Sequence, residues 1–201
     1  MIRNIVFDMG RVLLAFDPPD IASHFTDTPQ DAQLLAQNLF ESACWESLDR
    51  GTITHEDARN IVRLTLPERL HSNLDRAMKE WYRYIPPIDG MESLIHRLKE
   101  AGYHLYVLTN ASIQFYHYQD TLPAAGCFDG ILVSADYKML KPEPSIYHAL
   151  AERFDLVLSQ SLFIDDRPIN IAGAKNVGME AVLFEDAESL AQSLNHLGIL
   201  P

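Results

Sequence analysis

Short apolar runs and stretches of helical periodicity alternate along the chain. The first apolar run covers residues 3–7, where Ile5, Val6 and Phe7 lead directly into Asp8 and, two positions later, into Gly10. A run rich in β-branched residues that ends at a polar residue and a glycine is typical of a buried parallel strand entering a turn. The residues that follow, 11–16, are expected to form a short β-flap or an extended turn.

Between residues 17 and 86 the strand pattern disappears and helical spacing replaces it. The sequence Asp17-Pro18-Pro19 interrupts the chain, because two prolines after a polar residue make a stiff boundary. A second pair of prolines, in Ile85-Pro86-Pro87, closes the segment. Between these boundaries the spacing of apolar residues predicts helices over 31–40, 42–48, 55–64 and 67–84. Residues 17–86 are therefore expected to be a helical insertion, called here the cap segment, that either rocks as a lid or stays fixed.

After residue 87 helices and strands are expected to alternate. Strands are predicted at 103–108, 128–133, 161–164 and 180–184, and helices at 90–101, 145–154, 170–176 and 187–197, with one more helix after the loop 109–112. Strands separated by helices of this length form βαβ units. The predicted fold class is therefore α/β, a doubly wound parallel sheet covered on both faces. Residues 1–16 and 87–201 would form this core.

The composition is that of an ordinary globular protein, with 201 residues, 47% hydrophobic and 22% charged. No apolar run approaches the ~20 residues of a membrane span, and the N-terminus lacks the apolar stretch of a secretory signal. Cys44 and Cys127 are too far apart in the sequence to indicate a disulfide framework or a zinc site. We therefore expect a cytoplasmic protein with no membrane partner.

The formal net charge is -12, and the lysines and arginines form no cluster. A nucleic-acid partner is therefore not expected. The acidity does not exclude an anionic substrate, because a local lysine and a bound cation set the field at a site. Nothing in the sequence gives the oligomeric state.

Polar residues follow three of the predicted strands. Asp8 follows the first, Thr109-Asn110 the second and Asp165-Asp166 the fourth, while Lys141-Pro142 lies in the loop after the third. Taken singly, Thr109-Asn110 can be a helix N-cap pair and Lys141 a surface lysine. Adjacent aspartates are less ordinary, since like charges repel. Because these loops open on one edge of a doubly wound sheet, their convergence predicts a ligand site.

These residue types suit phosphoryl transfer with Mg²⁺. Asp8 can attack phosphorus as a carboxylate nucleophile. Because Mg²⁺ prefers oxygen ligands and binds through one or two carboxylates, Asp8 and Asp166 are predicted ligands, with the carbonyl of Gly10 as a further oxygen.

The phosphate group needs its own donors. The hydroxyl of Thr109 and the backbone N–H groups of Asn110 and Ala111 are predicted to receive the phosphate oxygens. Lys141 is expected to offset the charge that the carboxylates and the phosphate bring together.

Four motifs carry a resemblance to the haloacid dehalogenase-like (HAD) hydrolase superfamily: "FDMG" at 7–10, "LTN" at 108–110, "KPEP" at 141–144 and "FIDDRPINIAGAKNVGM" at 163–179. The resemblance implies a Rossmann-like core, a helical cap inserted after the first motif, Mg²⁺, and phosphatase activity on a small phosphorylated metabolite. The motifs look most like those of bacterial sugar phosphatases such as α-D-glucose-1-phosphate phosphatase, and of the N-terminal phosphatase domain of soluble epoxide hydrolase. Alignment with the family also implies that Asp166 is the main metal ligand of its motif, with Asp165 behind it or bound through water.

The chain departs from the family pattern at Gly10, where the phosphatases usually carry a second aspartate as general acid/base. Loss of such a group typically costs ~10²–10⁴-fold in rate. A water molecule or a residue of the cap segment can replace it, and the candidates there are Asp17, His24 and His55. A glycine at this position also suggests a backbone with positive φ, where a Cβ would be strained.

Two alternatives to a phosphatase stay open. One is a catalytically weak binding or regulatory protein that keeps the fold, for which Gly10 is the best argument. The other is a metal-independent 2-haloacid dehalogenase, which attacks carbon and gains nothing from two additional carboxylates. The physiological substrate depends on the cap segment, where the pocket candidates are Trp45, Arg50, His55, Trp81 and Tyr82. Aromatic residues at helical spacing are more often core residues than pocket residues.

Overall fold

A parallel sheet of five strands forms the centre of the computed structural model, which describes residues 1–200, in the order β3-β2-β1-β4-β5. The strands are β1 (Asn4–Phe7), β2 (His104–Thr109), β3 (Gly130–Val133), β4 (Ser161–Asp165) and β5 (Glu180–Leu183). In the register of the sheet, Phe7 lies between Val107 of β2 and Ile164 of β4. The carboxyl ends of these three strands therefore meet at one edge, and the predicted α/β class is confirmed.

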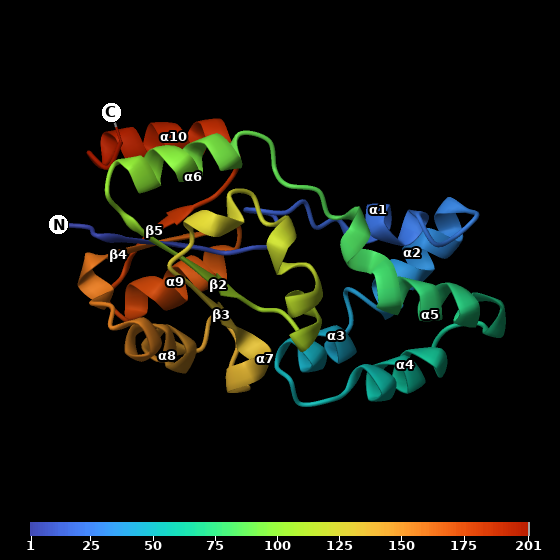
Figure 1. Cartoon of the computed structure of the whole chain (residues 1–201). Coiled ribbons are helices and arrows are strands. Elements are labelled where there is room, and N and C mark those ends of the chain that lie inside the picture. Colours follow the sequence, from blue (N-terminus) through green and yellow to red (C-terminus); the bar gives the residue numbers. More distant parts are fainter. Residues whose placement is uncertain (201) are drawn as a thin grey trace.

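Helices cover both faces of the sheet. Helices α6 (Met91–Glu100) and α10 (Ala187–His196) lie on one face, and α8 (Pro144–Phe154) and α9 (Pro168–Asn176) on the other (Figure 1). The alternation along β1 explains this, because Ile5 and Phe7 pack into the cluster of α6 and α10, and Val6 packs into that of α8 and α9. All four helices lie where the sequence predicts them.

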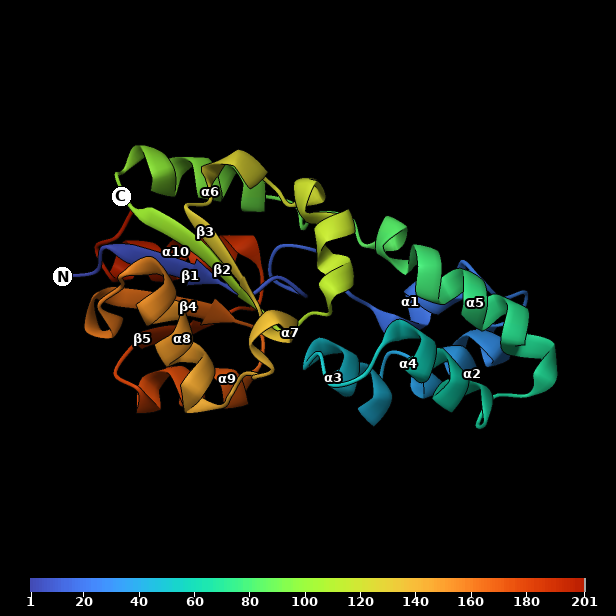
Figure 2. The ribbon, with the colours of Figure 1, turned by 60° about the horizontal axis from the view of Figure 1, so that its bottom comes forward.

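The cap segment is helical throughout and lies to one side of the sheet in both ribbon views (Figures 1 and 2). Its α-helices are α1 (Pro18–Ser23), α2 (Pro29–Asn38), α3 (Ala43–Asp49), α4 (His55–Arg63) and α5 (His71–Glu80), with 3₁₀ turns at Glu68–Leu70 and Trp81–Tyr84. Helix α1 was not predicted from the sequence. Prolines at the first two positions of a helix are well tolerated, and Asp17 accepts a hydrogen bond from the N–H of Asp20 as the N-cap. Pro18-Pro19 therefore begins a helix and does not simply interrupt the chain.

The two chain crossings between the core and the cap segment lie side by side. Leu14 forms an antiparallel bridge with Pro87. The N–H of Ala15 donates to the carbonyl of Pro86 at 2.8 Å, and the N–H of Ile88 donates to the carbonyl of Leu13 at 2.9 Å. The two hinges are thus close in space, as the paired prolines predict. The division at residues 17 and 86 itself stays a prediction.

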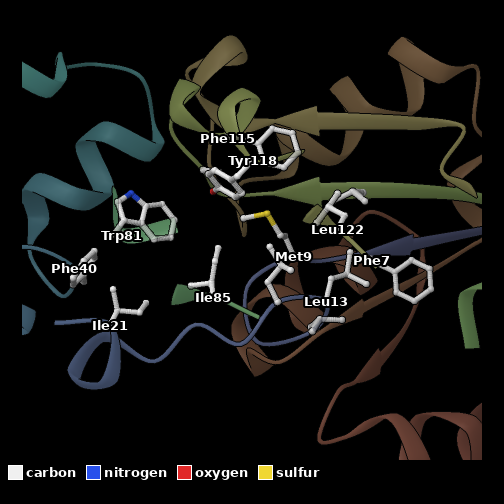
Figure 3. Close-up of a cluster of buried hydrophobic side chains, with 14 of the residues drawn as sticks. Phe7, Met9, Leu13, Ile21, Phe40, Trp81, Ile85, Phe115, Tyr118 and Leu122 are labelled. Carbon is white, nitrogen blue, oxygen red and sulfur yellow. The ribbon is translucent and has the colours of Figure 1, made fainter. Parts of the chain in front are cut away.

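One continuous apolar cluster joins the two parts. Figure 3 shows it running from Phe7 at the end of β1, past Met9 and Leu13, to Ile85 and Trp81 of the cap segment. All of these side chains are buried. The cap segment is therefore attached through packed side chains as well as through its two crossings.

The chain between β2 and β3 differs from the prediction. It contains three 3₁₀ turns, at Ile113–His117, Gln119–Thr121 and Ala125–Cys127, where a helix is expected from the sequence. Pro123 and the left-handed Ala124, with φ of 50°, prevent a continuous helix. The turns direct Phe115 and Tyr118 into the apolar cluster beside Trp81 (Figure 3).

A further short helix, α7 (Ser134–Tyr137), follows β3 and was also not predicted. No helix among residues 1–200 is long and apolar enough to span a membrane.

Candidate active site

Asp8 is fixed by the backbone at the end of the central strand. Its N–H donates to the carbonyl of Ile164 on β4 at 2.8 Å, which extends the ladder by one residue. A tight turn follows, in which the N–H groups of Leu13 and Leu14 both donate to the carbonyl of Met9. The side chain of Asp8 is 11% exposed, and its Oδ1 accepts the N–H of Met9 at 2.6 Å. This leaves Oδ2 as the oxygen available for chemistry.

Lys141 is buried between two carboxylates. Its Nζ lies 2.6 Å from Oδ1 of Asp8 and 2.8 Å from Oδ2 of Asp165. Although burial lowers the pKa of Lys141, the two carboxylates outweigh it and the net pKa is raised. Lys141 is therefore a cation at neutral pH and holds the two aspartates together.

Asp165 and Asp166 have different surroundings. Asp165 is fully buried and accepts from Lys141, from the N–H of Arg167 at 2.8 Å and from Nδ2 of Asn170 at 3.0 Å. Asp166 is half-buried and lines a cavity. Burial, followed by the charge of Asp165, raises the pKa of Asp166. Asp165 thus positions Lys141, while Asp166 faces the cavity.

The donor set fits a hard divalent cation. Single carboxylate oxygens of Asp8, Asp165 and Asp166 all lie within 4.8 Å of one another. Three carboxylates around a single lysine leave an excess of negative charge, and burial raises the pKa of Asp8 despite the opposing charge of Lys141. A cation bound there would hold Asp8 as the carboxylate that a nucleophile must be. Asp8 and Asp166, with Gly10 beside them on the cavity wall, are the residues that would hold Mg²⁺.

The loop after β2 provides the polar wall next to Asp8. Asn110 is tied to the backbone of Lys141, since its Oδ1 accepts the N–H of Lys141 at 2.9 Å and its Nδ2 donates to the carbonyl at 3.1 Å. Asn110 and Ala111 line the cavity, whereas Thr109 is buried and is not among the lining residues. The N–H of Ala111 donates to Oγ of Ser134 at 2.9 Å, so one predicted phosphate donor already has a partner.

The cavity above these residues has a volume of about 600 Å³, a common size for a small-molecule site. Core and cap segment both line it. The cap segment contributes an aromatic group in which the rings of Trp45 and Trp81 lie 5.2 Å apart, and a charged group on and after α3. The charged group consists of Glu46, Asp49 and Arg50.

Some predicted cap residues lie at the cavity and others do not. Trp45, Arg50 and Trp81 line it. His55 lies in a separate surface depression with Arg59 and Lys79, and Tyr82 stacks on Tyr118 with ring centroids 5.3 Å apart.

The predicted replacements for the missing acid lie elsewhere. Asp17 caps α1, and His24 stacks on Tyr84 with centroids 4.0 Å apart. Neither is among the cavity-lining residues, and His55 is not either. None of the three lies on the cavity wall.

Gly10 does not have the positive φ that its residue type suggests. The left-handed residue of the turn is Arg11, with φ of 61°, and its Nε donates to the carbonyl of Phe16 at 2.9 Å. A Cβ at Gly10 would meet only the Cβ of Phe16, at 3.8 Å, an ordinary contact. Space and backbone at Gly10 therefore admit a side chain, and the strain falls on the next residue.

Several residues at the site are not predicted from the sequence: Ser134, Asn170, Tyr118, Glu46 and Asp49. Asn170 lies inside a quoted motif, five residues after Asp165 and in the first turn of α9, which is a usable signal. Asp49 directly precedes Arg50 and the turn at Gly51, so a charged pair before a glycine marks it. Tyr118 has no comparable signal, because the loop that carries it was expected to be a helix.

Comparison with protein families gives a match to a model of haloacid dehalogenase-like hydrolases over residues 2–178. The chain belongs to this family. A sesquiterpene phosphatase from Aspergillus oryzae is 27% identical over 198 residues, which cover 97% of this chain and 96% of the relative. A D-ribitol-5-phosphate phosphatase from Bacteroides thetaiotaomicron is 23% identical over 203 residues, 96% of this chain and 97% of the relative.

Solved HAD structures share the fold. A HAD family enzyme from Bacteroides thetaiotaomicron, in complex with magnesium and inorganic phosphate, matches with a TM-score of 0.75 at 23% identity, over 96% of this chain and 99% of that one. The L-2-haloacid dehalogenase from Xanthobacter autotrophicus matches with a TM-score of 0.68 at 20% identity, over 100% and 85%. At these identities the structural likeness shows the fold alone.

Proposed function

We propose that this HAD hydrolase is a Mg²⁺-dependent phosphatase that hydrolyses a small phosphorylated metabolite through an aspartyl-phosphate on Asp8. One observation carries the proposal: Lys141 is buried between Asp8 and Asp165 while Asp166 faces the same cavity. A carboxylate nucleophile, a fixed cation and a spare carboxylate for a metal are the parts that phosphoryl transfer from an anionic ester requires.

In the proposed reaction, Oδ2 of Asp8 attacks phosphorus and the bond from phosphorus to the leaving oxygen breaks. Lys141 keeps Asp8 in place and offsets the charge of the phosphate, and the backbone at Asn110 lies where it can hold a phosphate oxygen. Mg²⁺, when bound, supplies further neutralisation of the charge on the phosphate and the carboxylates. Water then releases inorganic phosphate from Asp8.

The organic part of the substrate would lie against the cap segment. Its wall combines the rings of Phe40, Trp45 and Trp81 with the charged end of α3, so it can receive both apolar and polar groups. The two related phosphatases are named for a sesquiterpene and for D-ribitol-5-phosphate, which differ widely in that part. The proposal is therefore a phosphate monoester of a small organic alcohol, with a sugar phosphate as its narrower form.

A 2-haloacid dehalogenase is the weaker reading. That chemistry attacks carbon and needs no metal, so it provides no use for the half-buried Asp166 beside Asp8 and Asp165. A binding or regulatory protein is the other alternative, and Gly10 is its main support. It does not account for a buried lysine that holds the Asp8 carboxylate at the cavity wall.

The test is a screen of some tens of phosphorylated metabolites, with Mg²⁺ and with EDTA. We expect turnover that requires Mg²⁺ and is lost in Asp8→Asn. Dehalogenation of 2-haloacids in EDTA would favour the dehalogenase, and the absence of turnover on every ester would favour the binding or regulatory protein.

A cytoplasmic location remains part of the proposal, in keeping with free thiols at Cys44 and Cys127.

A further inference from the structure

The proposed phosphatase has no side chain at Gly10, the position at which phosphatases of the family usually carry the general acid on the core side of the cavity. In an in-line displacement the leaving oxygen departs on the side of phosphorus opposite to the nucleophile. Since Asp8 attacks from the end of β1, the leaving oxygen faces the cap segment. A donor for that oxygen must therefore stand on the wall opposite Asp8.

That wall has few titratable side chains: Glu41, Glu46, Asp49, Arg50 and Tyr118. Arg50 is fixed in an ion pair with Glu143 at 2.5 Å, and a guanidinium does not give up its proton. Burial, followed by the charge of Asp49, raises the pKa of Tyr118 far above its ordinary value, so its proton is held too tightly. Glu41 and Glu46 are exposed to solvent, and only Asp49 is a half-buried carboxyl.

Asp49 is held over the site by contacts with the core. Its carbonyl accepts a hydrogen bond from Oγ of Ser134. Its carboxyl is close enough to the backbone of Ser112, two residues after Asn110, for that N–H to lower its pKa. Gly51 seats the following turn, because its φ is 72° and a Cβ there would lie 2.4 Å from the carbonyl oxygen of Ala135. Lys138 also donates to the carbonyl of Gly51 at 3.0 Å. The end of α3 is therefore clamped onto the loops that follow β2 and β3.

We propose that Asp49 is the general acid and base of the reaction, replacing from the cap segment the side chain that Gly10 lacks. In the first step the bond from phosphorus to the leaving oxygen breaks, and the carboxyl proton of Asp49 passes to that oxygen. In the second step water attacks phosphorus from the vacated side, and one water proton returns to Asp49 as the bond to Asp8 breaks. Inorganic phosphate leaves, and both aspartates regain their starting states.

The charges around Asp49 favour this role. Burial raises the pKa of Asp49 well above its ordinary value, Glu46 on the same helix and Asp8 across the cavity raise it further, and the N–H of Ser112 opposes them. Tyr118 faces it from the 3₁₀ turns as a neutral phenol, and Arg50 beside it is occupied by Glu143. An acid must hold its proton until the leaving oxygen takes it, and burial together with these neighbours favours the protonated form of Asp49.

The experiment compares the full-length chain with Asp49→Asn on a series of aryl and alkyl phosphate monoesters in Mg²⁺. We expect Asp49→Asn to lose ~10²–10⁴-fold in kcat/KM, which reports the first step, on alkyl esters and much less on p-nitrophenyl phosphate, whose leaving group needs no proton. Asp49→Glu, which keeps a proton donor, should retain the wild-type slope against leaving-group pKa. The matched control is Asp27→Asn, an exposed carboxyl of the cap segment outside the cavity lining.

Two outcomes would overturn the role of Asp49 while leaving the phosphatase activity in place. One is an equal dependence of kcat/KM on leaving-group pKa in the wild type and in Asp49→Asn. The other is a steeper dependence in Glu46→Gln but not in Asp49→Asn. Absence of turnover in the wild type overturns the proposed function as well. The wild-type pH profile gives a measurement that does not depend on the variant folding. The fall in kcat/KM at high pH should be present for alkyl esters and absent for p-nitrophenyl phosphate, and the same profile for both would overturn the inference.

Discussion

The two walls of the cavity are built in different ways. On the core wall, Asp8 and Asp165 occupy the ends of adjacent strands, so the register of the sheet fixes their separation and Lys141 bridges them. On the cap wall, Trp45, Asp49 and Arg50 take their places from helix packing and from contacts between residues far apart in sequence. In the proposed reaction, the core wall carries the nucleophile and the metal ligands, while the cap wall contacts the leaving group and supplies its proton.

Replacement of the nucleophile is the strongest test of the core wall. Asp8→Asn should lower kcat by at least ~10³-fold, because the covalent route is lost. Amide and carboxylate have nearly the same shape, so the melting temperature should stay close to that of the wild type. Retention of more than a few per cent of the activity would remove Asp8 from this role.

Lys141 tests whether the core wall depends on a single charge. Lys141→Met leaves Asp8 and Asp165 facing each other without their shared cation. Breaking such a buried pair typically costs ~3–5 kcal/mol, which urea unfolding would measure, and turnover should fall with it. Lys175→Met, at an exposed lysine of α9, is the matched control. Equal stability of the two variants would contradict the role given to Lys141.

The two neighbouring aspartates of β4 and its exit loop should differ in their effect on the metal. Asp166→Asn is expected to raise the Mg²⁺ concentration for half-maximal activity by more than ~10²-fold. Asp165→Asn should raise it less, by ~10–100-fold, because Asp165 acts through Lys141 and Asn170. A larger effect in Asp165→Asn would reverse the assignment of the two residues.

Gly10→Asp moves a proton donor from the cap wall to the core wall. Because a Cβ at Gly10 has only one neighbour, at 3.8 Å, the variant should fold. In an Asp49→Asn background it should restore up to ~10²-fold in kcat on alkyl phosphates, and less in the wild-type background. Equal gains in the two backgrounds would show that Asp49 was not supplying the proton.

The smallest expected effect is one on stability. The pKa of Asp49 in the folded chain lies well above its value of about 3.9 in an unfolded chain. The folded chain then binds more protons, so the contribution of Asp49 to stability is present below pH ~3.9 and is lost as pH rises through the folded pKa. Asp49→Asn should therefore unfold at a higher temperature than the wild type at pH 8 and show no such gain at pH 4. A gain that does not change with pH would contradict the raised pKa.

The contrast between the walls also explains what the sequence could predict. Strand ends are marked by apolar runs that stop at a polar residue, so Asp8, Thr109 and Asp165 could be placed at one edge without a structure. Lys141 lies in a loop, but its position after the third predicted strand was sufficient to place it at the same edge of the sheet. The part of the site that the cap segment forms was predicted incompletely: Trp45, Arg50 and Trp81 were among the candidates, and Glu46 and Asp49 were not.

Asp49 shows why the prediction stopped there. Its position over Ser112 depends on the fit of Gly51 against Ala135, a contact between residues 84 positions apart (135 less 51) that no local pattern reveals. His55 and Asp17 have the right chemistry in the sequence but are directed elsewhere by the packing of α4 and α1. The local sequence pattern thus gave candidates for the missing acid, but long-range packing places these residues away from the cavity.

The aromatic group of the cap wall has a consequence for how the molecule can be observed. Trp45 and Trp81 are the only tryptophans of the chain, and both line the cavity. The Nε1 of Trp81 donates to Oε1 of Gln114 at 2.9 Å, and its ring meets Tyr118 edge to face. All tryptophan fluorescence of this protein therefore originates at the site, so emission from the unlabelled chain reports ligand entry and any separation of the two walls in real time.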